Sequence, residues 1–198
     1  MPHIDYYFST ISPFTYLAGN RLEEIAARHG ATIIYKPFDI GAIFGRTGGT
    51  PPKDRHPNRM AYRAQELRRG AKKAGLPMNM QPAFFPANGA PAAYAIIAAQ
   101  KEGGNVGALV QNVLRAVWAE DKNIAEDAVI RDCLTAAGFE ASVADKGLFT
   151  AADTYEANLE EAITRGVFGS PFYITDTDER FWGHDRLDDL DLHLSGKL

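Results

Sequence analysis

The 198-residue sequence contains a single cysteine, Cys133, and this scarcity excludes several kinds of chemistry. One cysteine cannot form an intramolecular disulfide, a C-x-x-C redox pair or a cysteine-rich zinc site, so no metal site is expected. Cys133 stands at helical spacing from Val129 and Ala137. Because free cysteine usually packs as a small hydrophobe, this spacing predicts a buried thiol with no role in catalysis.

The sequence also lacks an excess of basic residues, a long apolar run and a recognisable leader. The 21 Lys and Arg residues are outnumbered by 25 Asp and Glu residues, which gives a net charge of −4, whereas nucleic-acid-binding proteins are typically basic. No stretch approaches the roughly 18 apolar residues of a membrane span. Residues 1–5 have neither the charged start nor the apolar core of a signal peptide. We therefore expect a cytoplasmic protein that binds neither nucleic acid nor membranes.

Strand patterns occur at the two ends of the chain. Residues 4–8 and 32–37 are short apolar segments that predict strands, and the helical pattern between them ends at Gly30, which together make a βαβ unit. Near the C-terminus, two further short strands are joined by a turn at 176–179 and followed by a helix over 186–194.

The middle of the chain is predicted to be helical after an initial loop. Glycine and proline are frequent in residues 41–53, which predicts a loop, with the basic residues Arg46, Lys53, Arg55 and His56 in or beside it. Helices are expected over 57–75, 90–100, 106–119, 125–137 and 150–165. Since neither end of the chain is large enough to form a core alone, we predict one α/β domain built from residues 1–40 and 166–198. Residues 41–165 would be its inserted loop and helical domain.

Ser12 and Pro13 begin the first predicted helix. Serine is a preferred N-cap, worth around 1 kcal/mol, and proline suits the first helical position. A serine hydroxyl has too high a pKa to act alone as a nucleophile. At a helix start, however, it can donate a hydrogen bond beside the positive end of the helix dipole, which suits an incoming thiolate. The local pattern by itself favours the simple cap over this catalytic role.

Three segments resemble the 2-hydroxychromene-2-carboxylate isomerases, which belong with the kappa-class glutathione transferases to the DsbA-like branch of the thioredoxin superfamily. Ser12–Leu17 follows the first strand, where thioredoxin-like proteins carry C-x-x-C. Gly166–Pro171 precedes the third strand, where that fold has a cis-proline, and Phe181–Leu187 precedes the last helix. The resemblance spans the chain and implies a thioredoxin-like (DsbA-like) fold with a helical domain inserted between the βαβ and ββα pieces.

The function that this resemblance implies is glutathione-dependent isomerisation of 2-hydroxychromene-2-carboxylate, or a related aromatic pyruvate, to trans-o-hydroxybenzylidenepyruvate. It also implies a role in aromatic-compound degradation and a possible homodimer. Two alternatives stay open: a kappa-class-like transferase that conjugates glutathione to an electrophile, and a non-catalytic thioredoxin-fold module. A disulfide oxidoreductase is disfavoured because positions 12 and 15 hold serine and threonine.

The resemblance also assigns the residues that bind glutathione. Ser12 would stabilise its thiolate, and Ser170, before a cis Pro171, would offer backbone groups to its cysteinyl part. Phe168 and Gly169 would shape the approach to that segment. The γ-glutamyl amino group would be bound by Asp185 with help from His184, although an acidic residue there could simply cap the last helix. Arg186 is expected in a structural ion pair or on a solvated face.

The substrate carboxylate requires a cation, and Lys53, Arg55 and Arg59 are the candidates, with an ordinary solvated surface as the alternative. Family members often carry Pro-x-Lys where this chain has Pro57-Asn58-Arg59, and arginine does not reproduce the shape of lysine. By resemblance, Phe85 and Asn88 line the substrate pocket. Asn88 precedes a glycine and could equally form a turn, and Trp118 is expected in the core.

Overall fold

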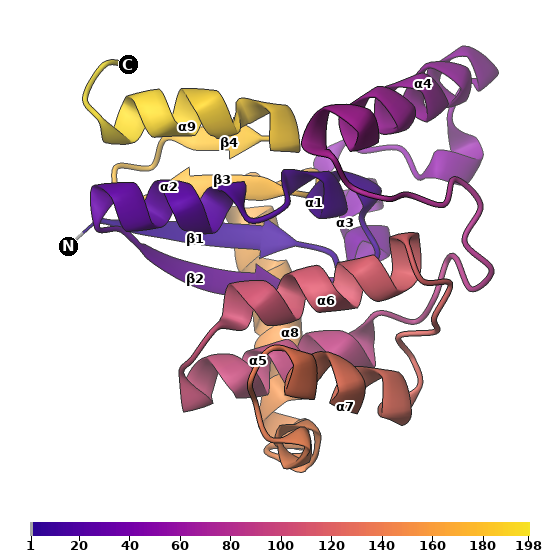
Figure 1. Cartoon of the computed structure of the whole chain (residues 1–198). Coiled ribbons are helices and arrows are strands. Elements are labelled where there is room, and N and C mark those ends of the chain that lie inside the picture. The colour runs from indigo at the N-terminus through magenta and orange to yellow at the C-terminus, as the bar shows by residue number, and fades with distance from the viewer. Residues whose placement is uncertain (1) are drawn as a thin grey trace.

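The computed structural model describes residues 2–198. Both ends of the chain contribute to one four-stranded sheet with the order β2-β1-β3-β4 (Figure 1). Its strands are β1 (His3–Phe8), β2 (Thr32–Pro37), β3 (Phe172–Thr175) and β4 (Arg180–Trp182). β1 pairs with β2 in parallel and with β3 antiparallel, and β3 pairs antiparallel with β4. The chain therefore has the βαβ and ββα pieces predicted for a DsbA-like thioredoxin fold.

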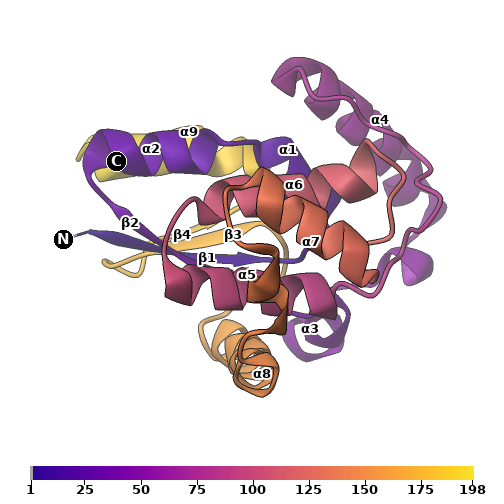
Figure 2. The same cartoon turned by 60° about the horizontal axis from the view of Figure 1, so that its bottom comes forward.

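Both faces of the sheet are buried against a core cluster. Consecutive side chains of β1 point to opposite faces and so enter different clusters. Tyr6 belongs to the larger core cluster, which also contains residues of the helices α1 (Pro13–Ala18), α2 (Arg21–His29) and α9 (Leu187–Leu194). Tyr7 belongs to a second cluster, on the opposite face. Figure 2 shows α2 and α9 on one side of the sheet and α3 and α8 on the other.

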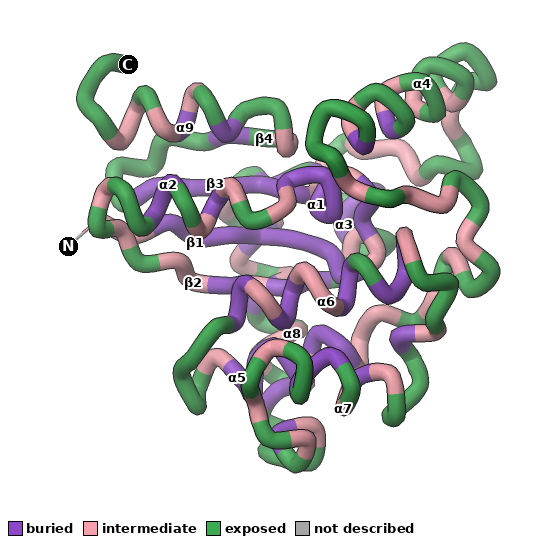
Figure 3. The backbone as a smooth tube through the Cα atoms, viewed as in Figure 1, coloured by how far each residue is buried: buried purple, intermediate pink, exposed green. Residues whose placement is uncertain are grey.

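Six helices connect the two ends. They are α3 (Ile40–Thr47), α4 (Pro57–Ala74), α5 (Ala90–Glu102), α6 (Val106–Trp118), α7 (Asp127–Ala136) and α8 (Leu148–Thr164). Short 3₁₀ turns occur at Pro52–Asp54, Ala141–Asp145 and His184–Arg186. α5 and α6 pack into the large core, whereas much of α4 is exposed (Figure 3). None of the helices in residues 2–198 is long and apolar enough to cross a membrane.

The prediction of a loop over residues 41–53 was wrong, because most of this segment forms α3. Asp39 caps the helix by accepting a hydrogen bond from the Gly41 amide at 2.7 Å. Ile43 and Phe44 are buried in the second core cluster. Burying these two side chains offsets the cost of glycine in a helix, which is about 1 kcal/mol per residue.

The first helix also differs from the prediction, since it is broken into α1 and α2. Gly19, after the last residue of α1, has a φ of 60°, in the region that favours glycine. α2 then runs from Arg21 to His29, and Gly30, which follows it, has the left-handed conformation. This second helix is tied to α9 by ion pairs of Arg21 with Asp188 and of Arg28 with Asp191.

Candidate active site

Ser12 is held where the chain leaves β1 and enters α1. Its Oγ accepts a hydrogen bond from the Thr15 amide at 3.2 Å, and Pro13 occupies the first helical position, so Ser12 is the N-cap that the sequence predicts. The serine is 8% exposed. The helix start thus fixes a hydroxyl group near the surface in a defined orientation.

Ser170 brings the C-terminal part of the chain to this hydroxyl. The Ser12 Oγ donates to the Ser170 carbonyl oxygen at 3.2 Å, and the Ser9 amide donates to the Ser170 Oγ at 2.9 Å. The Ser170 Oγ also lies 2.8 Å from the Thr15 Oγ1. The Ser170–Pro171 peptide bond is cis, as the family resemblance predicted. The Ser12 hydroxyl therefore already donates within the protein, and donating to a ligand would require it to rotate away from the Ser170 carbonyl.

Phe168 and Gly169, before this proline, lie against Trp182 of β4. The Phe168 ring is 39% exposed, and its centroid lies 4.8 Å from the Trp182 centroid. A Cβ on Gly169 would come within 2.2 Å of the Trp182 Nε1, so only glycine fits here without displacing the indole. The close contact fixes the backbone that leads to Ser170 and Pro171.

His184 and Asp185 lie in the 3₁₀ turn that precedes α9. The half-buried His184 ring stacks on Phe14 of α1 at a centroid distance of 5.7 Å, and burial lowers its pKa. The exposed Asp185 carboxylate accepts from Arg186 at 3.0 Å, and Arg186 also pairs with Asp189. Asp185 makes no side-chain cap on α9, so this alternative is wrong, whereas the structural ion pair expected for Arg186 is confirmed. His184 is thus connected through Phe14 to the helix that Ser12 begins.

The expected substrate residues are not brought together. Lys53 and Arg59 are exposed, Arg55 is partly buried, and none of the three lines the cavities that contain Phe85 or Asn88. Phe85 lines a cavity of about 370 Å³, and Asn88 lines a different one of about 230 Å³. The Asn88 Oδ1 accepts from the Ala90 amide at 3.1 Å, which is the turn that an Asn-Gly pair favours.

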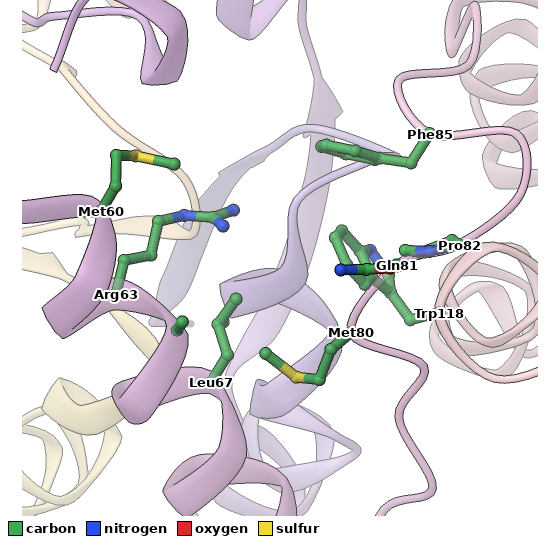
Figure 4. Close-up of a pocket in the computed structure, with 9 residues that line it drawn as sticks. Met60, Arg63, Leu67, Met80, Gln81, Pro82, Phe85 and Trp118 are labelled. Atoms are coloured by element: carbon green, nitrogen blue, oxygen red, sulfur yellow. The ribbon is translucent and has the colours of Figure 1, made fainter. Parts of the chain in front are cut away.

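Three residues with polar side-chain groups line the larger cavity although the sequence did not single them out as site residues: Arg63, Gln81 and Trp118 (Figure 4). Arg63 lies one helical turn after Arg59, and Trp118 is the last residue of α6. The available signal for Arg63 was its spacing from Arg59, which puts both side chains on one face of α4. Trp118 is 2% exposed, as the prediction of a core residue requires, yet its ring also forms part of the cavity wall.

Cys133 is buried on α7, and burial raises the pKa of its thiol to about 11. A thiol with this pKa is almost fully protonated near neutral pH and is a poor nucleophile. Within residues 2–198 there is no cluster of three His, Cys, Asp or Glu side chains placed to hold a metal ion. The chemistry of the site therefore depends on hydroxyl, carboxylate, imidazole and guanidinium groups.

Known proteins resemble the chain in both sequence and structure. Residues 3–195 match the family model of the DSBA-like thioredoxin domain. A 2-hydroxychromene-2-carboxylate isomerase of Sphingobium xenophagum is 31% identical over 96% of this chain and 97% of its own length. Another, from Pseudomonas putida, is 32% identical over 93% of this chain and 90% of its own length.

A glutathione S-transferase kappa 1 of Caenorhabditis elegans is 27% identical over 94% of this chain and 88% of its own length. The solved structure of a 2-hydroxychromene-2-carboxylate isomerase superposes with a TM-score of 0.78 at 28% identity, and covers 98% of this chain and 95% of that one. The similarity therefore extends over the fold and over all three segments that form the site.

Proposed function

Because the chain belongs to the DsbA-like thioredoxin family and, within it, to the 2-hydroxychromene-2-carboxylate isomerases, we propose that it is a glutathione-dependent isomerase. The proposed reaction converts 2-hydroxychromene-2-carboxylate, or a related aromatic pyruvate, to trans-o-hydroxybenzylidenepyruvate in the breakdown of aromatic compounds. The observation that carries the proposal is Ser12, which occupies the N-cap beside the cis Ser170–Pro171 bond, in a site without a protein thiol.

The residues of the site fit glutathione. Ser12 offers a hydroxyl donor, Ser170 offers backbone groups, and Asp185 offers an exposed carboxylate. When bound, glutathione would supply a sulfur nucleophile for reversible addition to the conjugated double bond, which allows rotation about that bond without net oxidation.

In this proposal, each of these residues has a separate task. The Ser12 hydroxyl turns from the Ser170 carbonyl toward the sulfur and favours its ionised form by hydrogen bonding. The Ser170 carbonyl that is released can accept from a peptide N–H, so rotation of one hydroxyl prepares both groups. Asp185 attracts the γ-glutamyl ammonium, and a charge-assisted hydrogen bond would fix the orientation of the peptide.

A spectrophotometric assay of 2-hydroxychromene-2-carboxylate with and without glutathione tests the proposal. We expect turnover only with glutathione, and the absence of any glutathione-dependent turnover would refute the isomerase function. Ser142, which is exposed on a 3₁₀ turn of the insertion, provides a matched control. Ser142→Ala should retain full activity, whereas Ser12→Ala should not.

A kappa-class-like transferase is the second candidate, because of the similarity to the Caenorhabditis elegans protein. It would form a stable conjugate between glutathione and an electrophile such as 1-chloro-2,4-dinitrobenzene, and mass spectrometry would detect this conjugate. A non-catalytic module, in contrast, would bind no glutathione in a calorimeter. Cytoplasmic localisation, where the glutathione pool keeps thiols reduced, and a homodimer are parts of the same proposal, which fractionation and light scattering can test.

A further inference from the structure

The larger cavity lies between α4 and the segment that joins α4 to α5 (Figure 4). Its volume of about 370 Å³ is at the small end of the range for ligand pockets, which suits one aromatic ring with a short side chain. Its described lining is mostly apolar, and Arg63 is the only charged residue in it. The lining residues are Met60, Arg63, Ala64, Leu67, Met80, Gln81, Pro82, Phe85 and Trp118.

Arg63 is a half-buried cation for which the described residues provide no counterion. No carboxylate pairs with it among the ion pairs of residues 2–198, whereas Arg131 and Arg165 each pair with more than one. Burial lowers the pKa of the Arg63 guanidinium, and the nearby charge of Arg55 lowers it further. Since a guanidinium stays protonated even so, the cavity has a positive charge that an anion would stabilise.

Trp118 forms part of the cavity wall together with Phe85. Its indole Nε1 is buried and has no hydrogen-bond partner. The Phe85 ring lies against the indole at a centroid distance of 4.9 Å and a tilt of 50°. Arg63, Phe85 and Trp118 thus combine a cation with two aromatic surfaces.

The cavity is connected to Ser12 through α1. The Arg63 guanidinium lies over the ring of Phe14, 5.7 Å from its centroid, and Phe14 is two residues after Ser12. α1 packs against both α4 and α6, the helices that carry Arg63 and Trp118. A ligand held in the cavity would therefore lie beside the helix that begins with the proposed glutathione site.

We propose that this cavity binds the aromatic carboxylate substrate, with Arg63 pairing with the carboxylate and Phe85 and Trp118 contacting the ring. For the identity of the natural substrate, this inference rests on the proposed function. It replaces Lys53, Arg55 and Arg59 with Arg63 as the residue that binds the substrate anion.

Binding can be measured without glutathione and without turnover. We would titrate the protein with trans-2-hydroxycinnamate, an aromatic carboxylate probe, and with its methyl ester, which is similar in shape and uncharged. Loss of a hydrogen-bonded ion pair corresponds to roughly 10- to 100-fold in affinity. We expect the acid to bind at least 10-fold more tightly than the ester, and Arg63→Gln to abolish this preference.

Arg68→Gln is the matched control, because Arg68 is exposed on the same helix and does not line the cavity. It should leave the affinity for the acid unchanged. Trp118→Phe should weaken binding several-fold and remove the quenching of tryptophan fluorescence that the probe causes. Circular dichroism would confirm that each variant folds. If Trp118→Phe does not fold, Arg63→Gln still decides the test, because Arg63 is half-exposed and its substitution is not expected to disrupt the core.

Equal affinities of the wild-type protein for acid and ester would overturn the inference, as would equal losses in Arg63→Gln and Arg68→Gln. The two proposals can fail separately. Arg63-dependent binding without isomerisation would refute the proposed function and leave the subsite in place. Isomerisation with an unchanged KM in Arg63→Gln would refute the subsite and leave the function in place.

Discussion

The hydroxyl of Ser12 donates a hydrogen bond of 3.2 Å to the backbone carbonyl of Ser170, and so joins the start of α1 to the residue before cis-Pro171. The same hydroxyl also accepts from the Thr15 amide. One serine thus has a structural task and a donor that a ligand can use. These two tasks can be separated experimentally, because the cap affects stability and the donor affects the bound thiol.

We predict that Ser12→Ala lowers turnover roughly 10- to 100-fold, the range for losing a hydrogen bond to a charged group. The apparent pKa of bound glutathione, followed by the ultraviolet absorbance of the thiolate, should rise. Loss of the cap should also cost about 1 kcal/mol of stability. If turnover and thiol pKa stay unchanged while stability falls, Ser12 is only a cap.

Asp185→Asn should raise the KM for glutathione roughly tenfold with little change in kcat, because it removes the proposed partner of the γ-glutamyl ammonium. Asp189→Asn is the control, since Asp189 pairs with the same Arg186 at 3.1 Å. Initial rates at varied glutathione concentration give both constants. Equal effects of the two substitutions would assign Asp185 to a merely structural ion pair.

The buried carboxylate of Asp5 should be important for stability. Asp5 is 4% exposed, and it pairs with Arg165 and with Lys36, whose Nζ lies 3.1 Å from the Asp5 Oδ1. Asp5→Asn leaves both cations without their buried partner, and we expect a loss of about 3 kcal/mol in urea unfolding. Glu160→Gln, which breaks an exposed pair with Arg46, should leave the urea midpoint nearly unchanged.

Glu23 should make stability fall as the pH rises. Burial raises the pKa of Glu23, its Oε2 has no partner, and the Tyr35 hydroxyl donates to its Oε1 at 3.0 Å. A carboxyl whose pKa is higher in the folded state contributes stability that is complete below its unfolded pKa of about 4.3. This contribution is lost as the pH rises through the folded pKa.

Glu23→Gln is neutral at every pH and can still accept from Tyr35. We expect a higher melting temperature than that of the wild type at pH 7, and a smaller difference between the two proteins at pH 4. The exposed neighbour Glu24 serves as control, because Glu24→Gln should leave the pH dependence of the wild type in place. Identical melting curves for the wild type and Glu23→Gln across this pH range would contradict the argument.

Cys133 should be unreactive in the native protein. With burial and a pKa of about 11, it should not react with a thiol reagent over minutes at pH 8, and one thiol per chain should react in denaturant. Reaction of the folded protein at the rate of a free thiol would show that α7 opens readily.

Much of the fold could be predicted from local patterns in the sequence. Pro57 and Gly75 mark the ends of α4, and Gly30 and Gly166 follow helices in the structure as expected. These signals work because the conformational limits of proline and glycine do not depend on distant residues. α3 was missed because its helix is stabilised by tertiary burial of Ile43 and Phe44, which outweighs the local preference of glycine.

In the candidate site, too, some features follow from the sequence and others depend on tertiary packing. Ser12 as a helix cap follows from local chemistry, and the cis Ser170–Pro171 bond follows from the family resemblance. The sequence could not show that Arg63, rather than Arg55 or Arg59, lines the cavity, because only the packing of α4 determines which basic side chain enters it. Trp118 shows that burial and participation in a ligand site do not exclude each other.

The position of β1 between β2 and β3 also has a consequence for how the protein is made. A ribosome releases β1, α1 and β2 early, but the strand that completes the other side of β1 is separated from it by the whole helical insertion. The partner of Ser12 is 158 residues downstream. A nascent chain that stops before Ser170 has its serine cap but lacks half of the site, so the site is assembled only when synthesis is nearly complete.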